Sequence, residues 1–138
     1  MAVFEGRNES VEVYRDDERN RIVVAPRGHW TMATGSLAIA EFSRLLGNGT
    51  AHFVGDIRVM EGYESSVRRA WQKAFTLAGK RILSFTFVGR STPLVRMGVA
   101  AMSLYLQVPF KSVDALPGLR PARHSSAVEE SPIRRQIS

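Results

Sequence analysis

Two adjacent serines, Ser65 and Ser66, are the residues of this chain whose type and position most directly suggest chemistry. They follow a glycine-containing turn and precede a segment with helical periodicity, so we expect them at the start of a helix. Unpaired backbone amides and the helix dipole favour negative charge at such a position. Arg68 and Arg69 follow three and four residues after Ser65, within pairing reach. The pattern therefore suits a phosphorylated serine, or simply a serine that caps its helix.

Carboxylates and aromatic residues flank the serines. Asp56 ends an apolar segment and Glu64 immediately precedes Ser65. A solvated strand-end Asp56 that bonds loop amides is the simpler interpretation of this pair, because the segment has no histidine to complete an acid–base site. Trp30 and Tyr63 are expected in loops, where large aromatic side chains either contact a partner or close the end of the core.

The motifs of common enzyme classes are absent from the sequence. There is no GxSxG, Walker, GxGxxG or HExxH pattern. The absence of cysteine excludes disulfides, thiolate zinc sites and cysteine nucleophiles. His29, His52 and His124 lie far apart and lack the spacing of metal ligands. We therefore expect neither an enzyme nor a bound metal or cofactor.

The elements that must position these residues form an α/β pattern. Residues 11–14 and 21–28 are rich in β-formers and flank a charged turn, which predicts an N-terminal β-hairpin. Residues 1–10 have no periodic pattern and should fray or lie along an edge. Three helices are predicted at 33–46, from the serines to 78, and at 92–106, and further strands at 51–57, 82–88 and 110–116. Right-handed connections would place the helices mainly on one face of a mixed sheet of four to five strands.

The helix that begins at the serines has the clearest pattern. Val67, Trp71 and Phe75 recur at intervals of four residues, with alanines between them. Arg68 and Arg69 are among the polar residues that take the other face. This apolar stripe predicts a helix docked on a sheet with its first residues in water.

Composition and charge indicate one soluble domain. The 138 residues are 44% apolar and 23% charged, as is typical of globular proteins of one domain. No apolar run reaches about 18 residues and the N-terminus does not resemble a signal peptide, so we expect a cytoplasmic protein without membrane contact. We predict a single domain over residues 1–116. A flexible tail is expected over residues 117–138, where proline and serine become frequent.

The positive charge is concentrated in the second part of the chain. Residues 1–56 carry six basic against eight acidic residues, a net charge of −2, whereas residues 57–138 carry thirteen against five, a net charge of +8. Nucleic acid is an unfavoured partner, because most aromatic residues sit at core-like spacings and few remain for stacking on bases. An acidic protein surface would suit the charge better.

The order of elements and the residues around the serines resemble the STAS domain family, which includes the SpoIIAA-like anti-sigma-factor antagonists. In that family a strand ends in Asp, a second Asp stands eight residues on, and Ser-Ser-Gly opens a helix. Here Asp56 ends the strand, Glu64 stands eight residues on, and Ser65, Ser66 and Val67 follow. The resemblance implies a divergent STAS-like fold over about residues 11–116. It places Ser65 where many members carry a Ser or Thr that a partner kinase phosphorylates.

The sequence therefore predicts a non-enzymatic regulatory domain that binds another protein and is switched by phosphorylation of Ser65 or Ser66. The partner implied by the resemblance is a kinase or an anti-sigma-like protein, and the oligomeric state is left open. The residues predicted to contact the partner are Asp56, Arg58, Glu61, Tyr63, Glu64, Arg68 and Arg69. The alternative is a SEC14-like binder of a small apolar ligand or lipid, which requires an enclosed apolar cavity of about 300 Å3 or more.

Overall fold

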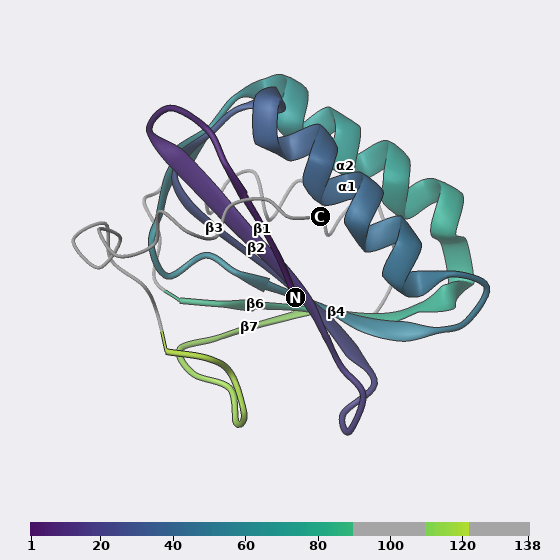
Figure 1. Cartoon of the computed structure of the whole chain (residues 1–138). Helices are drawn as coiled ribbons and strands as arrows, with labels where there is room; N and C mark the ends of the chain where they lie inside the picture. Colours follow the sequence, from purple (N-terminus) through teal and green to yellow (C-terminus); the bar gives the residue numbers. More distant parts are fainter. Residues whose placement is uncertain (90–109, 122–138) are drawn as a thin grey trace.

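The computed structural model describes residues 1–89 and 110–121, which form one mixed sheet with two helices on one face (Figure 1). The strands are β1 (Ala2–Glu5), β2 (Glu9–Asp16), β3 (Arg21–Trp30), β4 (Ala51–Asp56), β5 (Met60–Tyr63), β6 (Ile82–Val88) and β7 (Phe110–Val113). The helices are α1 (Met32–Leu46) and α2 (Ser65–Ala78), and a short 3-10 helix, η1 (Gly79–Arg81), follows α2. No helix in this described part of the chain is long and apolar enough to cross a membrane.

The strands follow the order β1-β2-β3-β4-β6-β7, with β5 beside β3. Strands β1, β2 and β3 pair antiparallel, whereas β3, β4, β6 and β7 run parallel. β3 is long enough to pair with two successive strands, with β4 over residues 21–24 and with β5 over residues 28–30. The chain therefore runs from β4 to β5 along β3, which brings the start of α2 close to the end of β3.

The sheet is larger than the sequence predicted. The described residues form seven strands instead of four to five, because residues 2–5 pair with β2 as an edge strand and residues 60–63 pair with β3. The sequence did not predict β5, because this strand has only four residues and contains a glycine, so its own β-propensity is weak. The hairpin and the first two helices are confirmed. The third predicted helix, at 92–106, lies outside the described residues.

Pro26 lies inside β3, which continues to Trp30. The amide of Gly28, two residues on, donates to the Val59 carbonyl on the side of β4 and β5. Since residues of equal parity in a strand direct their amides to the same side, the nitrogen of Pro26 faces that side too. Pro26 lies between the β3 residues that pair with β4 and the β3 residues that pair with β5. No ladder hydrogen bond is lost there, so proline is tolerated inside the sheet.

The main core lies between the sheet and the two helices and is rich in aromatic rings. Phe53 of β4 lies 4.8 Å from Phe75 of α2 between ring centroids, and Phe75 lies 4.8 Å from Phe85 of β6. The apolar stripe predicted for α2 is buried as expected, with Val67, Trp71, Phe75 and Ala78 inside. Gly35 lets α1 approach α2, because a Cβ there would lie only 3.3 Å from a methyl group of Val67.

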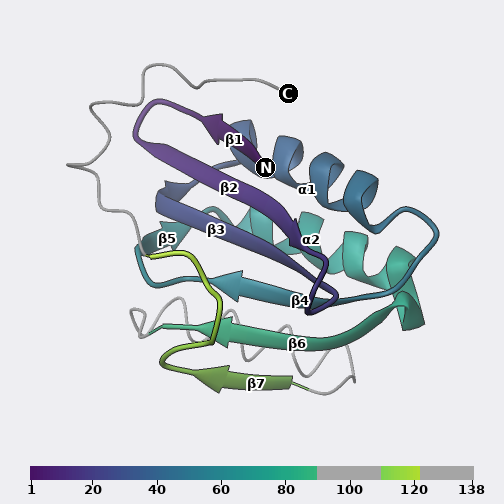
Figure 2. The same cartoon turned by 60° about the horizontal axis from the view of Figure 1, so that its bottom comes forward.

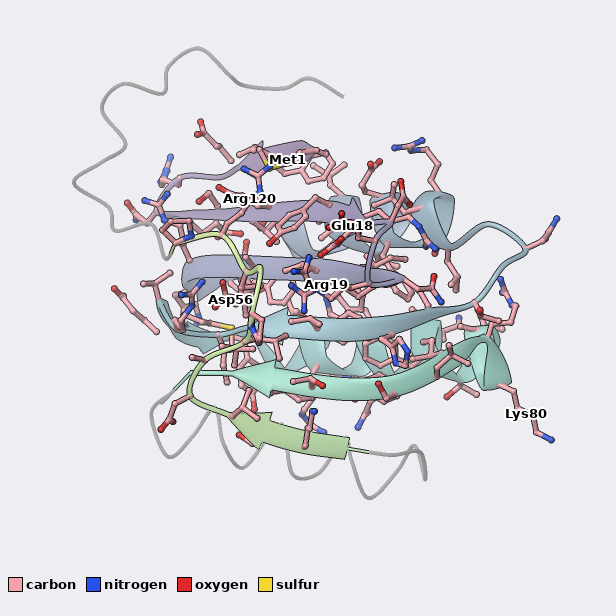
Figure 3. All side chains as sticks on the ribbon, turned by 90° about the horizontal axis from the view of Figure 1, so that it is seen from below. Met1, Glu18, Arg19, Asp56, Lys80 and Arg120 are labelled. Carbon is pink, nitrogen blue, oxygen red and sulfur yellow. The ribbon has the colours of Figure 1, made fainter. Side chains whose placement is uncertain are left out.

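The face of the sheet opposite α1 and α2 carries a second, smaller apolar cluster. Residues 114–121 leave β7 and cross this face (Figures 2 and 3). Leu116, Leu119 and Tyr14 pack against valines of the central strands. Burial raises the pKa of the Tyr14 hydroxyl, although the neighbouring Arg120 opposes this increase. The first residues of the predicted tail, 117–121, therefore lie against the sheet, and the rest of it lies outside the described residues.

Candidate functional site

Asp56 and Arg58 form a bidentate ion pair at the end of β4. The Asp56 carboxylate accepts two hydrogen bonds from the Arg58 guanidinium, at 2.8 and 2.7 Å, and one from the Arg58 amide at 3.2 Å. These bonds raise the pKa of Arg58. Asp56 does bond a loop amide as predicted, but it is only 6% exposed and not solvated. Its carboxylate therefore fixes the turn between β4 and β5.

Arg58 connects this turn to the face of the sheet opposite α1 and α2. Its Nη2 donates to the carbonyl of Arg120 at 2.5 Å, within the segment that crosses that face. Gly89 packs against the other side of Arg58, where a Cβ would lie 2.8 Å from the Arg58 Cα. The φ of Gly89 is +117°, a value that favours glycine. Asp56 and Arg58 thus hold the turn after β4 and the segment around Arg120 together.

The two aromatic residues expected in loops are in strands. Trp30 ends β3 and is 7% exposed, with its ring centroid 5.8 Å from that of Trp71. Tyr63 ends β5, and the next amide, of Glu64, donates to the Trp30 carbonyl at 2.9 Å. Trp30 therefore closes the end of the core, which was the alternative to its contacting a partner.

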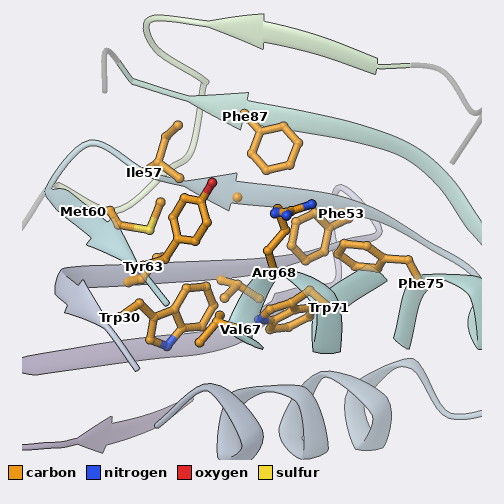
Figure 4. Close-up of a pocket in the computed structure, with 13 residues that line it drawn as sticks. Trp30, Phe53, Ile57, Met60, Tyr63, Val67, Arg68, Trp71, Phe75 and Phe87 are labelled. Carbon is orange, nitrogen blue, oxygen red and sulfur yellow. The ribbon is translucent and has the colours of Figure 1, made fainter. Parts of the chain in front are cut away.

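A small apolar cavity lies between the sheet and α2. Trp30, Tyr63, Arg68 and Trp71 are among its lining residues, and Figure 4 shows Tyr63 and Arg68 beside it. Its volume is about 70 Å3, which is far below the roughly 300 Å3 that a small-molecule site requires. The cavity formed by the described residues therefore does not favour the ligand-binding alternative.

Several hydrogen-bond acceptors occupy the start of α1. Thr31 caps it by accepting from the Ala33 amide at 3.3 Å. Glu9 of β2 accepts from the amide and the hydroxyl of Thr31, at 3.1 and 2.8 Å, and from the Thr34 hydroxyl. Glu64, from the start of α2, accepts from the Met32 amide at 2.9 Å. These five hydrogen bonds leave the first turn of α1 little capacity for another anion.

The start of α2 is open by comparison. Glu64 is its N-cap residue, but its side chain makes no capping hydrogen bond to α2 because it reaches to α1 instead. The Val67 amide bonds the Glu64 carbonyl at 3.0 Å, so the earlier amides of Ser65 and Ser66 remain as donors of the first turn. Ser65 is exposed and Ser66 is half-buried. The predicted serines are therefore accessible at an uncapped helix start.

The cations of α2 divide between two sides of the helix. Arg69 is exposed, whereas Arg68 is half-buried and lines the small cavity (Figure 4). Glu61, on β5, is exposed as well. Most predicted contact residues thus gather around the first turn of α2. We call these residues the α2 N-terminal surface: Glu61, Tyr63, Glu64, Ser65, Ser66, Arg68 and Arg69.

Glu9 was missed as a residue that holds the start of α1. Glu9 stands 22 residues before Thr31, in a segment without a periodic pattern, so only the fold reveals their contact. Within residues 1–89 and 110–121, no three histidine, aspartate or glutamate side chains lie close enough together to hold a metal ion.

No protein-family model matches the sequence, and no curated protein matches it. Solved structures nevertheless share its architecture. A protein with a SpoIIAA-like fold from Shewanella loihica PV-4 is 14% identical with a TM-score of 0.60, over 78% of this chain and 87% of that one. SiaC, the activator in complex with the diguanylate cyclase SiaD of Pseudomonas aeruginosa, is 15% identical with a TM-score of 0.57, over 82% and 98%.

SpoIIAA, an anti-sigma factor antagonist in its unphosphorylated form, is 11% identical with a TM-score of 0.50, over 87% of this chain and 96% of that one. Together these similarities show that the chain has a divergent SpoIIAA-like fold, as the resemblance to STAS domains predicted.

Proposed function

We propose that this chain is a non-enzymatic regulatory domain that binds another protein through the α2 N-terminal surface. The observation that carries the proposal is the open first turn of α2, with Ser65 exposed on a fold shared with partner-binding regulators. SiaC is the activator of a diguanylate cyclase and SpoIIAA is an anti-sigma factor antagonist. The partner that we propose here is likewise a regulatory protein of the cytoplasm, such as a kinase or an anti-sigma-like protein.

We further propose that phosphorylation of Ser65, or of Ser66, switches this binding. A phosphate adds a charge of about −1.5 to −2 and three acceptor oxygens. The first-turn amides of α2 and its positive dipole end would stabilise that charge, and Arg69 lies in the next turn. The Glu64 carboxylate is held by the Met32 amide, so it does not occupy the first turn of α2. A partner that reads this surface would meet a different charge in each state.

Affinity capture from the native cell tests both parts of the proposal. Wild-type protein, Ser65→Ala, Ser66→Ala, Ser65→Asp and Arg69→Glu would be compared, with intact-mass measurement and site mapping of the recovered chains. Ser112→Asp and Lys111→Glu are matched controls, because both residues are exposed on β7. We expect one regulatory protein whose recovery changes at least about tenfold with Arg69→Glu or Ser65→Asp and less than twofold with the controls.

The two parts can fail separately. If the chain is never modified at Ser65 or Ser66, the switch is wrong and the binding role remains. If the Ser65 and Arg69 variants recover every partner as well as the β7 controls do, the α2 N-terminal surface is not the contact.

A further inference from the structure

The two helices form a groove on their outer side, away from the sheet. α1 and α2 lie side by side (Figure 1). The groove between them has a volume of about 310 Å3. Its walls extend on α2 from Ala70 to Ala78 and continue to Arg81 in η1. At a rise of about 1.5 Å per residue, this is about three helical turns.

The α1–α2 groove is apolar and carries an unusually exposed leucine. Leu77 lines it and is 75% exposed, the largest exposed fraction of any large apolar side chain in the described residues. Ile39 and Met32 line the opposite wall. Exposed apolar surface of this kind in a concave site is a feature of protein-binding grooves.

Small residues in the groove permit the close approach of a third helix. Ser36 and Ser43 of α1 and Ala70 and Ala74 of α2 line it. Packed helices lie about 8–10 Å apart, and the shorter distances require small side chains at the contact. A bilayer surface is flat and would contact the rims of such a groove more readily than its floor.

The positive charge around the groove favours an acidic partner. Residues 65–81 contain no acid and carry five cations: Arg68, Arg69, Lys73, Lys80 and Arg81. Lys73 and Arg81 line the groove itself. On α1, the acid Glu41 is paired with Arg44 at 2.6 Å, so it does not neutralise the cations of α2. A second copy of this chain would bring like charges together at this site, whereas an acidic partner would be attracted.

We propose that the α1–α2 groove binds an acidic amphipathic helix of a partner protein, with leucine-like anchors against Leu77 and Ile39 and carboxylates beside Lys73 and Arg81. This inference rests on the proposed protein-binding function and names the chemistry of the partner. The groove begins five residues after Ser65, about 7–8 Å along the helix, so one partner can reach the serine and the groove together.

A displayed library of helical peptides tests the inference without any cellular partner. Each 18-residue peptide carries leucine at positions i, i+4, i+7 and i+11, with glutamate, lysine or glutamine at random elsewhere. The purified folded chain selects binders, and fluorescence polarisation then measures the affinity of single peptides. We expect the selected pool to contain several-fold more glutamate than lysine.

Variants locate the binding site. Leu77→Glu and Lys73→Glu should each weaken binding at least about tenfold. Leu83→Glu and Lys111→Glu are matched controls on β6 and β7, with exposed side chains of the same types, and should change affinity less than twofold. Circular dichroism checks that each variant is folded. Because Leu77 is 75% exposed, its replacement should leave the helix intact.

Several outcomes would overturn the inference. These are a failure to select any binder, a pool without acidic bias, or equal loss of affinity in the groove and control variants. Binding of phosphatidylglycerol vesicles that depends on Leu77 while the peptides do not bind would assign the groove to a lipid surface instead. None of these results involves Ser65, so the proposed function stands or fails separately through cellular capture.

Discussion

Helices α1 and α2 begin in opposite ways, although each follows a strand of the same sheet. The first turn of α1 receives acceptors from Thr31, from Glu9 on a neighbouring strand and from Glu64. The first turn of α2 receives no capping bond from its own N-cap side chain and presents Ser65 to solvent. Glu64 causes both differences, since it precedes α2 but bonds α1.

The same contrast extends along the two helices. On α1 the one acid and the one arginine, Glu41 and Arg44, neutralise each other. On α2 there is no acid, and Arg68, Arg69 and Lys73 are without a compensating acid in the helix. Internal pairing makes α1 a structural element, while the open dipole end and positive face of α2 are suited to an anionic partner. The comparison therefore supports the proposal that α2 supplies most of the charge that a partner would contact.

Removal of Glu9 should produce the largest change in stability. Its carboxylate accepts from the Thr31 amide, the Thr31 hydroxyl and the Thr34 hydroxyl, and Thr34 is 1% exposed. Glu9→Ala leaves a buried hydroxyl without this partner, so we expect the free energy of unfolding to fall by about 2–3 kcal/mol.

Urea denaturation measures this change. Glu9→Gln keeps one acceptor oxygen and should lose less than Glu9→Ala. Glu5→Ala, at an exposed position of β1, is the control and should stay within about 0.5 kcal/mol. If Glu9→Ala and Glu5→Ala behave alike, the start of α1 is not held by Glu9 and the comparison loses its basis.

Introducing an aspartate at the start of each helix should give effects of opposite sign. Ser65→Asp places a negative charge at the open end of α2 and should raise the free energy of unfolding by about 0.3–1 kcal/mol. Ala33→Asp, also exposed in a first turn, adds charge beside the carboxylates of Glu9 and Glu64 and should lower it. Both effects should shrink between low salt and about 1 M salt. Equal signs in thermal or urea denaturation would contradict the proposed difference.

The sequence predicted the positions of the hairpin and of α1 and α2 correctly, but it predicted too few strands. The stripe Val67, Trp71, Phe75 and the hairpin are strong periodic patterns, and both appear in the structure. Strand β5 could not be predicted, because its four residues become a strand only when the end of β3 offers an unpaired edge. Local patterns do not contain that information.

The candidate site was also predicted in part. Ser65 was placed at an exposed helix start by periodicity alone, and the structure agrees. The burial of Asp56 could not be foreseen, because it depends on how Arg58 folds back over the carboxylate. The contact of Glu9 with α1 joins residues from different elements, so only the register of the sheet makes it visible.

The smallest expected effect is a pH dependence of stability that comes from the Glu41–Arg44 pair of α1. The hydrogen bond from Arg44 lowers the pKa of Glu41. Its folded pKa then lies below its unfolded value, so the pair contributes stability above the unfolded pKa, near pH 4.3, and loses it as pH falls through the folded pKa. A double-mutant cycle with Glu41→Gln and Arg44→Gln isolates this contribution in urea denaturation.

The cycle should show a favourable coupling between Glu41 and Arg44 at pH 7 that disappears near pH 3. A coupling that persists at pH 3 would mean that packing, and not charge, joins the two side chains. A cycle with no coupling at pH 7 would mean that Glu41 leaves Arg44 uncompensated. α1 would then carry free positive charge as α2 does, and the difference between the two helices would be confined to their first turns.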